Sequence, residues 1–349
     1  MLNREIYSKP PKENPLVNNG VVEVSEDYSE AAQSVLRYEL ETFVCDGQYE
    51  KGLETILDKF LLNLGQRAEQ PGVWISGFYG SGKSHLAKML RTLWTDFKFN
   101  DGAAARGIAK LPSGVTDALK ELTNQGKRHG GVHAAAGKLG AGAGDNVRLA
   151  LMGIVFKSKN LPEQYNQALF VMWLKREGLL DAVDAELKAI GRSVAQELPH
   201  MYVSSHLAKA LLKARPGFAN TDADARQLIK AQFPQMADIT NEQMVSAITG
   251  ALTTEGKFPL TLVVLDEVQQ YIGTDADKAY KVQEITESLC KHFRGELLFV
   301  GTGQSALTGT PSLQRIKGRF PVEVMLGDWD VENVTRQIIL AKKPSARPL

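Results

Sequence analysis

One glycine-rich stretch, GFYGSGKS (77–84), has the residue types and spacing of a phosphate-binding loop. Gly77, Gly82, Lys83 and Ser84 match the pattern G-x-x-x-x-G-K-[ST]. Glycines let backbone N–H groups converge on phosphate oxygens, and a following helix adds its positive N-terminal end. A tight turn with an exposed lysine is the alternative, but it needs only one or two glycines. The residues expected to bind nucleotide are Gly77, Phe78, Tyr79, Gly80, Ser81, Gly82, Lys83, Ser84 and His85.

A pair of adjacent acids, Asp266 and Glu267, follows the apolar run LTLVVL (260–265). Taken alone, such a pair is a set of solvated charges at the end of a strand. Beside a phosphate-binding loop, it predicts catalysis, because phosphate-bound Mg²⁺ needs an acid at the end of a neighbouring strand. We therefore expect Ser84 and Asp266 to hold the metal, with Lys83 on the β- and γ-phosphates. Glu267 is expected to orient and polarise an attacking water.

Two further segments could complete this site. The apolar run in LLFVGTGQSAL ends in Thr302 and Gln304, either of which could hold the attacking water or the γ-phosphate. A turn without a chemical role is an equally good interpretation. Arg319, in LQRIKGRFPVEVML, could face the nucleotide of a neighbouring subunit, and such an arginine adds roughly 10³–10⁵ in rate. A solvated basic loop is the alternative.

Other chemistries lack support in the sequence. No N-K-x-D string is present, which favours ATP over GTP as the nucleotide. The histidines form no zinc pattern, and there is no G-x-S-x-G or cysteine–histidine signature of another hydrolase class. ATP and Mg²⁺ are therefore the expected cofactors.

The strands and helices that would position these residues predict an α/β fold. A short run at 72–76 before the glycine loop predicts a strand, and 85–94 after it predicts a helix. Further strands are expected at 130–137, 260–265, 296–301 and 320–326, and helices at 28–44, 49–65 and 276–293. The long separation between loop and acids is filled by a largely helical insertion, 147–256. Residues 1–20 are expected to form a flexible N-terminal arm.

The composition is that of a globular protein. The 349 residues are 43% hydrophobic and 23% charged, and the net charge of +1 indicates no particular polyanion. Cys45 and Cys290 match no metal spacing, and the N-terminus has no apolar core of a signal peptide. No run approaches the ~20 apolar residues that span a bilayer. We expect a reduced, cytoplasmic protein with no membrane association.

Several longer strings resemble a known family. VWISGFYGSGKSHLAKML, GKLGAGAGDNVRLALMGIVF, LTLVVLDEVQQYIG, LLFVGTGQSALTGTPSLQRIKGRF and DVENVTRQIILAKKP together resemble BrxC, the P-loop ATPase of the bacterial BREX phage-defence system. BrxC is similar to PglY of the related phage-growth-limitation system. The resemblance covers about residues 20 to 344, and LDEVQQYIG and GTGQSALTGTP are its more specific strings.

The resemblance implies an AAA+-like fold, with ATP hydrolysis in a complex that methylates host DNA and blocks phage replication. It implies three partners: the BREX methyltransferase, an alkaline-phosphatase-like protein and a small accessory protein. Self-association, and DNA contact that is indirect or made through regions outside this chain, are also expected. By position, Thr302 or Gln304 becomes a first sensor, Arg319 the finger, and Lys342 or Lys343 a residue near a second sensor.

One departure from the family concerns length, since its proteins are several times longer than this chain. The chain stops where a helical lid is expected, so 345–349 is interpreted as a truncated tail. Two other functions remain open at this stage. One is a nucleotide-dependent assembly scaffold with little hydrolysis, and the other is an ATP-dependent DNA loader outside defence, for which the short basic clusters at 126–131 and 315–319 are the clues.

Overall fold

The computed structural model describes residues 6–8, 24, 29–139 and 146–343. The chain divides into two compact units, one of Met1–Asp145 with Thr253–Leu349 and the other of Asn146–Leu252. The expected arm, apart from residues 6–8, and the expected tail at 345–349 lie outside the described residues. Tyr7 forms an isolated antiparallel bridge with Lys342.

A five-stranded parallel sheet organises the first unit. Its strand order is β2-β3-β4-β1-β5, and every neighbouring pair is parallel. The strands are β1 (Val73–Ser76), β2 (Val132–Lys138), β3 (Leu260–Asp266), β4 (Leu297–Gly303) and β5 (Val322–Met325). The four strands β1 to β4 contain mostly buried residues, as expected for parallel strands that are covered on both faces.

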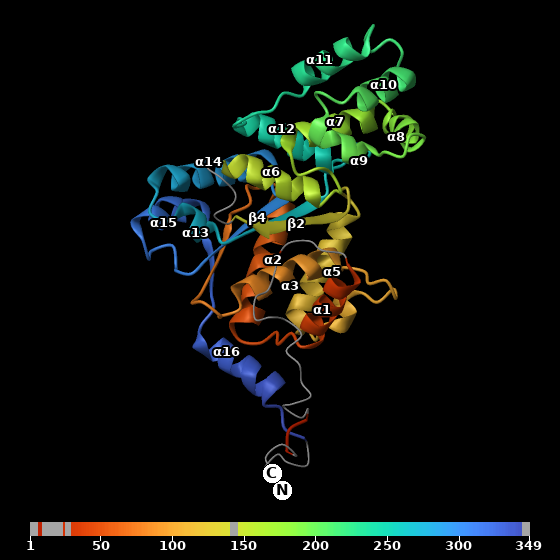
Figure 1. Ribbon diagram of the computed structural model, residues 1–349. Helices are drawn as coiled ribbons and strands as arrows, with labels where there is room; N and C mark the ends of the chain where they lie inside the picture. The colour runs from red at the N-terminus through yellow and green to blue at the C-terminus, as the bar shows by residue number, and fades with distance from the viewer. Residues whose placement is uncertain (1–5, 9–23, 25–28, 140–145, 344–349) are drawn as a thin grey trace. The chain divides into compact units, whose positions relative to one another are not determined.

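Helices cover both faces of this sheet. On one face, α2 (Gln48–Gln66), α3 (Lys83–Thr95) and α5 (Ser113–Gly126) pack against β1, β2, β3 and β5, whereas α13 (Val268–Ile272) and α14 (Ala276–His292) pack on β4 from the other side (Figure 1). The structure also describes these helices in this unit: α1 (Glu30–Glu41), α4 (Ala105–Ile108), α15 (Pro311–Ile316), η4 (Lys317–Arg319), α16 (Asp328–Val334) and the π-helical η5 (Thr335–Ile339).

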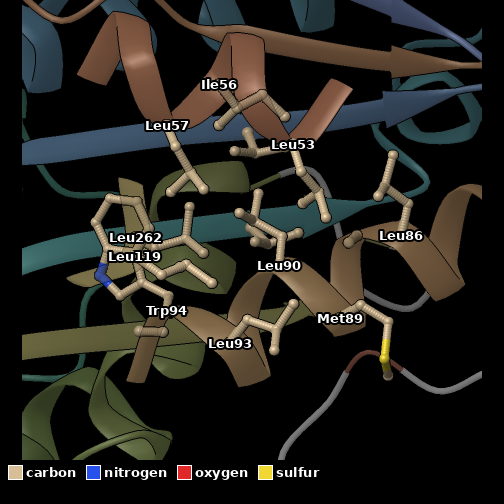
Figure 2. Close-up of a cluster of buried hydrophobic side chains, with 14 of the residues drawn as sticks. Leu53, Ile56, Leu57, Leu86, Met89, Leu90, Leu93, Trp94, Leu119 and Leu262 are labelled. Carbon is tan, nitrogen blue, oxygen red and sulfur yellow. The ribbon is translucent and has the colours of Figure 1, made fainter. Parts of the chain in front are cut away.

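The core beneath this sheet anchors the helix that follows the glycine loop. Leu86, Leu90 and Trp94 are buried at helical spacing on α3 and belong to one hydrophobic cluster with Leu57 of α2 and Leu262 of β3 (Figure 2). The indole of Trp94 also donates a hydrogen bond to the carbonyl of Leu260 (3.0 Å). Because α3 is fixed in this way to both a helix and a strand, the loop at its N-terminus is held in one place relative to β3.

The second unit is helical throughout and has a core of its own. It consists of α6 (Val147–Lys157), α7 (Tyr165–Arg176), α8 (Leu180–Lys188), α9 (Val194–Glu197), η3 (Leu198–His200), α10 (Ser205–Ala214), α11 (Asp222–Gln232) and α12 (Asn241–Leu252). Phe170 packs on Trp173 and Phe233 with ring centroids 5.9 and 5.4 Å apart. Tyr202 joins the same core, donating to the carbonyl of Phe233 (2.5 Å).

The fold class predicted from the sequence is confirmed: a P-loop α/β architecture in which helices flank a parallel sheet and a mostly helical insertion interrupts the chain. The unit boundary at 252 lies a few residues before the end of the predicted insertion, because Thr254 and Lys257 already form a bridge that leads into β3.

Candidate active site

Polar side chains from separate strands meet at the carboxyl edge of the sheet. Lys138 ends β2 directly opposite Asp266, which ends β3. Thr302 lies near the end of β4, and β4 separates β3 from β1, the strand that leads into the glycine loop. Parallel strands end at the same edge, so residues far apart in sequence are brought to one place.

The glycine loop turns tightly onto the start of α3. Gly82 has φ 88° at the N-cap of α3, in the left-handed region that favours glycine. A Cβ at this position would lie 1.8 Å from the Tyr49 hydroxyl, which donates a hydrogen bond to the carbonyl of Ser81 (3.1 Å). Burial raises the pKa of Tyr49, so the phenol stays protonated as a donor. The second glycine of the pattern is therefore required by both conformation and space.

Ser84 and Asp266 are joined directly. The Ser84 hydroxyl donates to Oδ2 of Asp266 at 2.8 Å, across 182 positions of sequence. The other carboxylate oxygen of Asp266 accepts from the hydroxyl of Thr302. Asp266 is 1% exposed, so its carboxylate is held in a fixed orientation by two hydroxyl groups inside the protein. The two residues predicted to hold the metal thus lie within hydrogen-bond distance of one another.

Glu267 has a left-handed backbone conformation at the end of β3. Its φ of 63° is uncommon for a residue with a Cβ. The Glu267 N–H donates to Thr302 Oγ1 (3.0 Å) and Asp266 Oδ1 (3.1 Å), and these bonds hold the unusual geometry. The carboxylate lies 3.7 Å from the Lys138 ammonium group. Lys138 was not among the residues predicted from the sequence, although its position at the end of a predicted strand, after AAAG (134–137), was an available signal.

Lys83 lies at the mouth of the same site. Its ammonium group donates to the carbonyl of Phe78 within the loop (2.8 Å). Partial burial lowers the pKa of Lys83, and the nearby Asp266 carboxylate acts in the opposite direction. A lysine with a lowered pKa gains from an additional anionic partner such as a phosphate.

A cavity of about 250 Å³ connects these groups. It is lined by Tyr79, Gly80, Gly82, Lys83, Ser84, His85, Lys138, Asp266, Glu267, Gln269, Gln270, Thr302, Gly303 and Gln304. Of the residues predicted for nucleotide binding, Gly77, Phe78 and Ser81 belong to the loop but do not line this cavity. Thr302 is 1% exposed and already bonded to the two acids, whereas Gln304 is exposed. Gln304 is therefore the better placed of the two to contact a ligand.

The loop that carries Gln304 is held on both sides by hydrogen bonds to Ser305. Gln269 accepts from the Ser305 N–H (2.8 Å) and donates to its hydroxyl (3.3 Å). The Trp74 indole donates to the Ser305 carbonyl (3.0 Å). These three bonds fix the backbone next to Gln304 relative to β1 and α13.

Arg319 lies at the opposite end of the strands. Its carbonyl accepts from the N–H of Gly72, just before β1 begins, whereas the glycine loop follows the end of β1. The Arg319 guanidinium group pairs with Glu287 at 2.6 Å. The structure thus does not bring Arg319 to the cavity of its own chain. Lys342 and Lys343 are exposed and also do not line it.

A second cavity, of about 240 Å³, lies on the other side of the glycine loop. Its walls come from α1, the segment before α2, and α16 with η5. The lining residues are Tyr38, Glu39, Thr42, Phe43, Val44, Tyr49, Gly80, Ser81, Gly82, His85, Val331, Val334, Thr335, Ile338 and Ile339. Gly80, Gly82 and His85 line both cavities, so the two meet at the loop. Much of this second lining is aromatic or aliphatic, whereas the first cavity is lined by two acids and two lysines.

No protein-family model matches the chain. The solved structures that are similar include the ORC1 protein of Aeropyrum pernix in complex with DNA, with a TM-score of 0.36 and 11% sequence identity. That likeness covers 88% of this chain and 54% of the other, so the chain spans about half the length of this structural neighbour.

The described residues offer neither a membrane-spanning helix nor a metal site built from protein ligands alone. No helix there is long and apolar enough to cross a bilayer. Within the same residues, no three or more His, Cys, Asp or Glu side chains gather as a potential metal site. A hydroxyl and one carboxylate, as at Ser84 and Asp266, suit Mg²⁺ bound mainly through phosphate oxygens and water, rather than a metal held by protein ligands alone.

Proposed function

We propose that this chain binds ATP with Mg²⁺ and hydrolyses it. The observation that carries the proposal is the 2.8 Å hydrogen bond from Ser84 to Asp266, which places the loop and the acid strand around one cavity. Lys83 and the loop N–H groups would bind the β- and γ-phosphates, and Ser84 and Asp266 would hold Mg²⁺. The bound Mg²⁺ would neutralise charge on the phosphates.

The chain's own residues suggest how hydrolysis would proceed. Glu267 lines the cavity and directly follows Asp266, the proposed metal ligand. Its carboxylate would therefore orient and polarise the attacking water. Gln304, on a loop fixed at Ser305, would contact that water or the γ-phosphate. Thr302 would act through Asp266 and Glu267, holding both in position.

The direct test is steady-state ATPase activity of the wild type beside Lys83→Ala and Glu267→Gln. Glu267→Gln should retain ATP binding and lower kcat by about 10²-fold or more, since a positioned general base contributes that much. Lys83→Ala should weaken ATP binding itself. Equal activity in all three proteins would refute the catalytic assignment.

Arg319 is proposed to act on a neighbouring subunit. It lies beyond the start of β1, at the end of the sheet away from its own phosphate loop, so a nucleotide that it contacts would be bound to another copy of the chain. Self-association follows from this proposal. Mixing Arg319→Ala chains, which retain an intact site, with Lys83→Ala chains, which retain the arginine, should restore part of the activity lost by each.

The finer proposal is that this ATPase serves an AAA+-like role in bacterial BREX phage defence. Its support is the resemblance of the strings around the loop, the acids and 297–316 to BrxC. The partners would be the methyltransferase, the phosphatase-like protein and the accessory protein of that system. Co-purification of these proteins with the chain, and loss of phage resistance in a Lys83→Ala strain, would test the role.

A second candidate function is a nucleotide-dependent assembly scaffold with little hydrolysis. The observation that favours it is the proximity of the Lys138 ammonium group to the Glu267 carboxylate, 3.7 Å, which competes with a water for that carboxylate. If the pair restrains catalysis, Lys138→Met should raise kcat while the affinity for ATP changes little. A kcat unchanged or lowered in Lys138→Met would remove the support for this alternative.

A further inference from the structure

Glu39 is a buried acid that the proposed hydrolysis does not use. It lies on α1, is 2% exposed and lines the second cavity. Its Oε2 atom lies 2.7 Å from the ammonium group of Lys88, on α3. Neither carboxylate oxygen has a hydrogen-bond partner among the described residues, and Oε1 also lacks the nearby cation that Oε2 has. Buried acceptors are almost always paired in native proteins, so an unpaired one in a cavity wall can accept a hydrogen bond from a molecule bound there.

The cavity in front of Glu39 suits the base of a nucleotide. It adjoins the phosphate cavity across Gly80, Gly82 and His85. The ring of Phe43 lies 5.6 Å from the ring of His85 and 6.0 Å from that of Tyr49, forming an aromatic wall. Val334 and Ile338 contribute aliphatic surface to the same cavity. An apolar cleft with one placed polar group is the usual design of a site for a flat heterocycle.

The pairing with Lys88 restricts what Glu39 can recognise. A carboxylate with both oxygens free would bind the two adjacent donors of guanine, N1–H and the 2-amino group. Here the ammonium group of Lys88 lies 2.7 Å from one oxygen, Oε2, and obstructs it, which leaves Oε1 as the acceptor for a base. Adenine has a single amino donor at position 6, where guanine instead carries a carbonyl acceptor.

We infer that Glu39 is the residue that selects adenine, accepting a hydrogen bond from the 6-amino group through its Oε1 atom. The inference rests on the proposed function, because it needs a nucleoside triphosphate in the adjoining phosphate cavity. It deepens that function by naming the side chain that reads the base. Phe43 and the aliphatic side chains would hold the ring, and Glu39 would determine which ring is accepted.

The test compares ATP with purine riboside triphosphate, which lacks only the 6-amino group, by titration in the presence of Mg²⁺. The wild type should bind ATP about 10- to 100-fold more tightly, the worth of a hydrogen bond to a charged acceptor. In Glu39→Met with Lys88→Met, which removes both charges together, the two nucleotides should bind nearly equally. Lys88→Met alone keeps the acceptor and should keep the preference for ATP.

A further variant guards against misfolding of the double mutant. Glu39→Asp keeps a negative charge near Lys88 but shortens the side chain by one methylene group. The carboxylate then lies farther from the base, so the preference for ATP should also fall. A wild type that binds both nucleotides equally, or a preference unchanged in both Glu39 variants, would overturn the inference while leaving ATP binding intact. Failure of the wild type to bind any triphosphate would instead overturn the proposed function and the inference with it.

Discussion

Individual side chains at the carboxyl edge of the sheet have separate chemical and positioning roles. Asp266 is oriented by hydrogen bonds within the protein itself, from the hydroxyl groups of Ser84 and Thr302. Glu267 keeps a left-handed backbone because its N–H is bonded to Thr302 and Asp266. Thr302 is therefore the residue through which both acids are positioned, although the sequence showed it only as one of two polar residues after a strand.

Replacing Thr302 with valine should separate positioning from binding. The change removes a donor to Asp266 and an acceptor for Glu267 while keeping the side-chain shape. Each hydrogen bond involving a charged group is worth about 1.5–3 kcal/mol, so kcat should fall about 10- to 100-fold. The affinity for ATP should change much less, and Thr302→Ser should restore most of the activity. A fall in affinity equal to the fall in kcat would contradict the positioning role.

His85 should make stability sensitive to acid. Burial lowers the pKa of His85 from its usual 6.5, with Glu39 acting in the opposite direction and Lys88 adding to the fall. Because the folded pKa lies below the unfolded one, this group destabilises the fold as pH falls below about 6.5, by at most about 1.4 kcal/mol per pH unit. Denaturant unfolding at pH 7.5 and 5.5 should show a smaller loss for His85→Asn than for the wild type. Equal losses would contradict this effect.

Among the secondary-structure elements, α2 and α3 hold the glycine loop in place through their shared core. Leu57 on α2 is fully buried in this core (Figure 2). Leu62 on the same helix is 51% exposed. The two positions form a matched pair in one helix. They separate the effect of core packing from the effect of helix propensity.

Leu57→Ala should lower the free energy of unfolding by about 2–5 kcal/mol, because it removes buried atoms and leaves a cavity. Leu62→Ala should change it by no more than about 0.5 kcal/mol. Urea unfolding of both variants measures the difference. Similar losses at both positions would show that the helix does not pack as described.

The features that could be predicted from the sequence are those that depend only on residues close together in the chain. The order of residues in GFYGSGKS and in LTLVVLDE predicted the loop, the helix after it and the two acids, because these features depend on neighbouring residues. Lys138 was missed because its contact with Glu267 exists only once β2 and β3 are paired. Glu39 was missed because the second cavity forms between α1, the loop and α16, and no local pattern indicates such packing.

At the scale of the whole molecule, the chain combines a sheet-based unit with a separate helical unit. Residues 146–252 have their own aromatic core, built from Phe170, Trp173 and Phe233. A fragment of about this length with a contiguous core can fold alone. Expressed by itself, it should show helical circular dichroism and a single cooperative thermal transition. A non-cooperative melt would show that this unit depends on the rest of the chain.

The most direct test of the central claim is the dependence of ATP affinity on Mg²⁺, measured by calorimetric titration of wild type and Asp266→Asn. If the loop and Asp266 share one magnesium–triphosphate site, the wild type should bind ATP more tightly with Mg²⁺ than with EDTA. Asp266→Asn should lose this gain while keeping the Mg²⁺-independent affinity supplied by Lys83 and the loop. A gain from Mg²⁺ that is the same in both proteins would contradict the convergence of Ser84 and Asp266 on one metal ion.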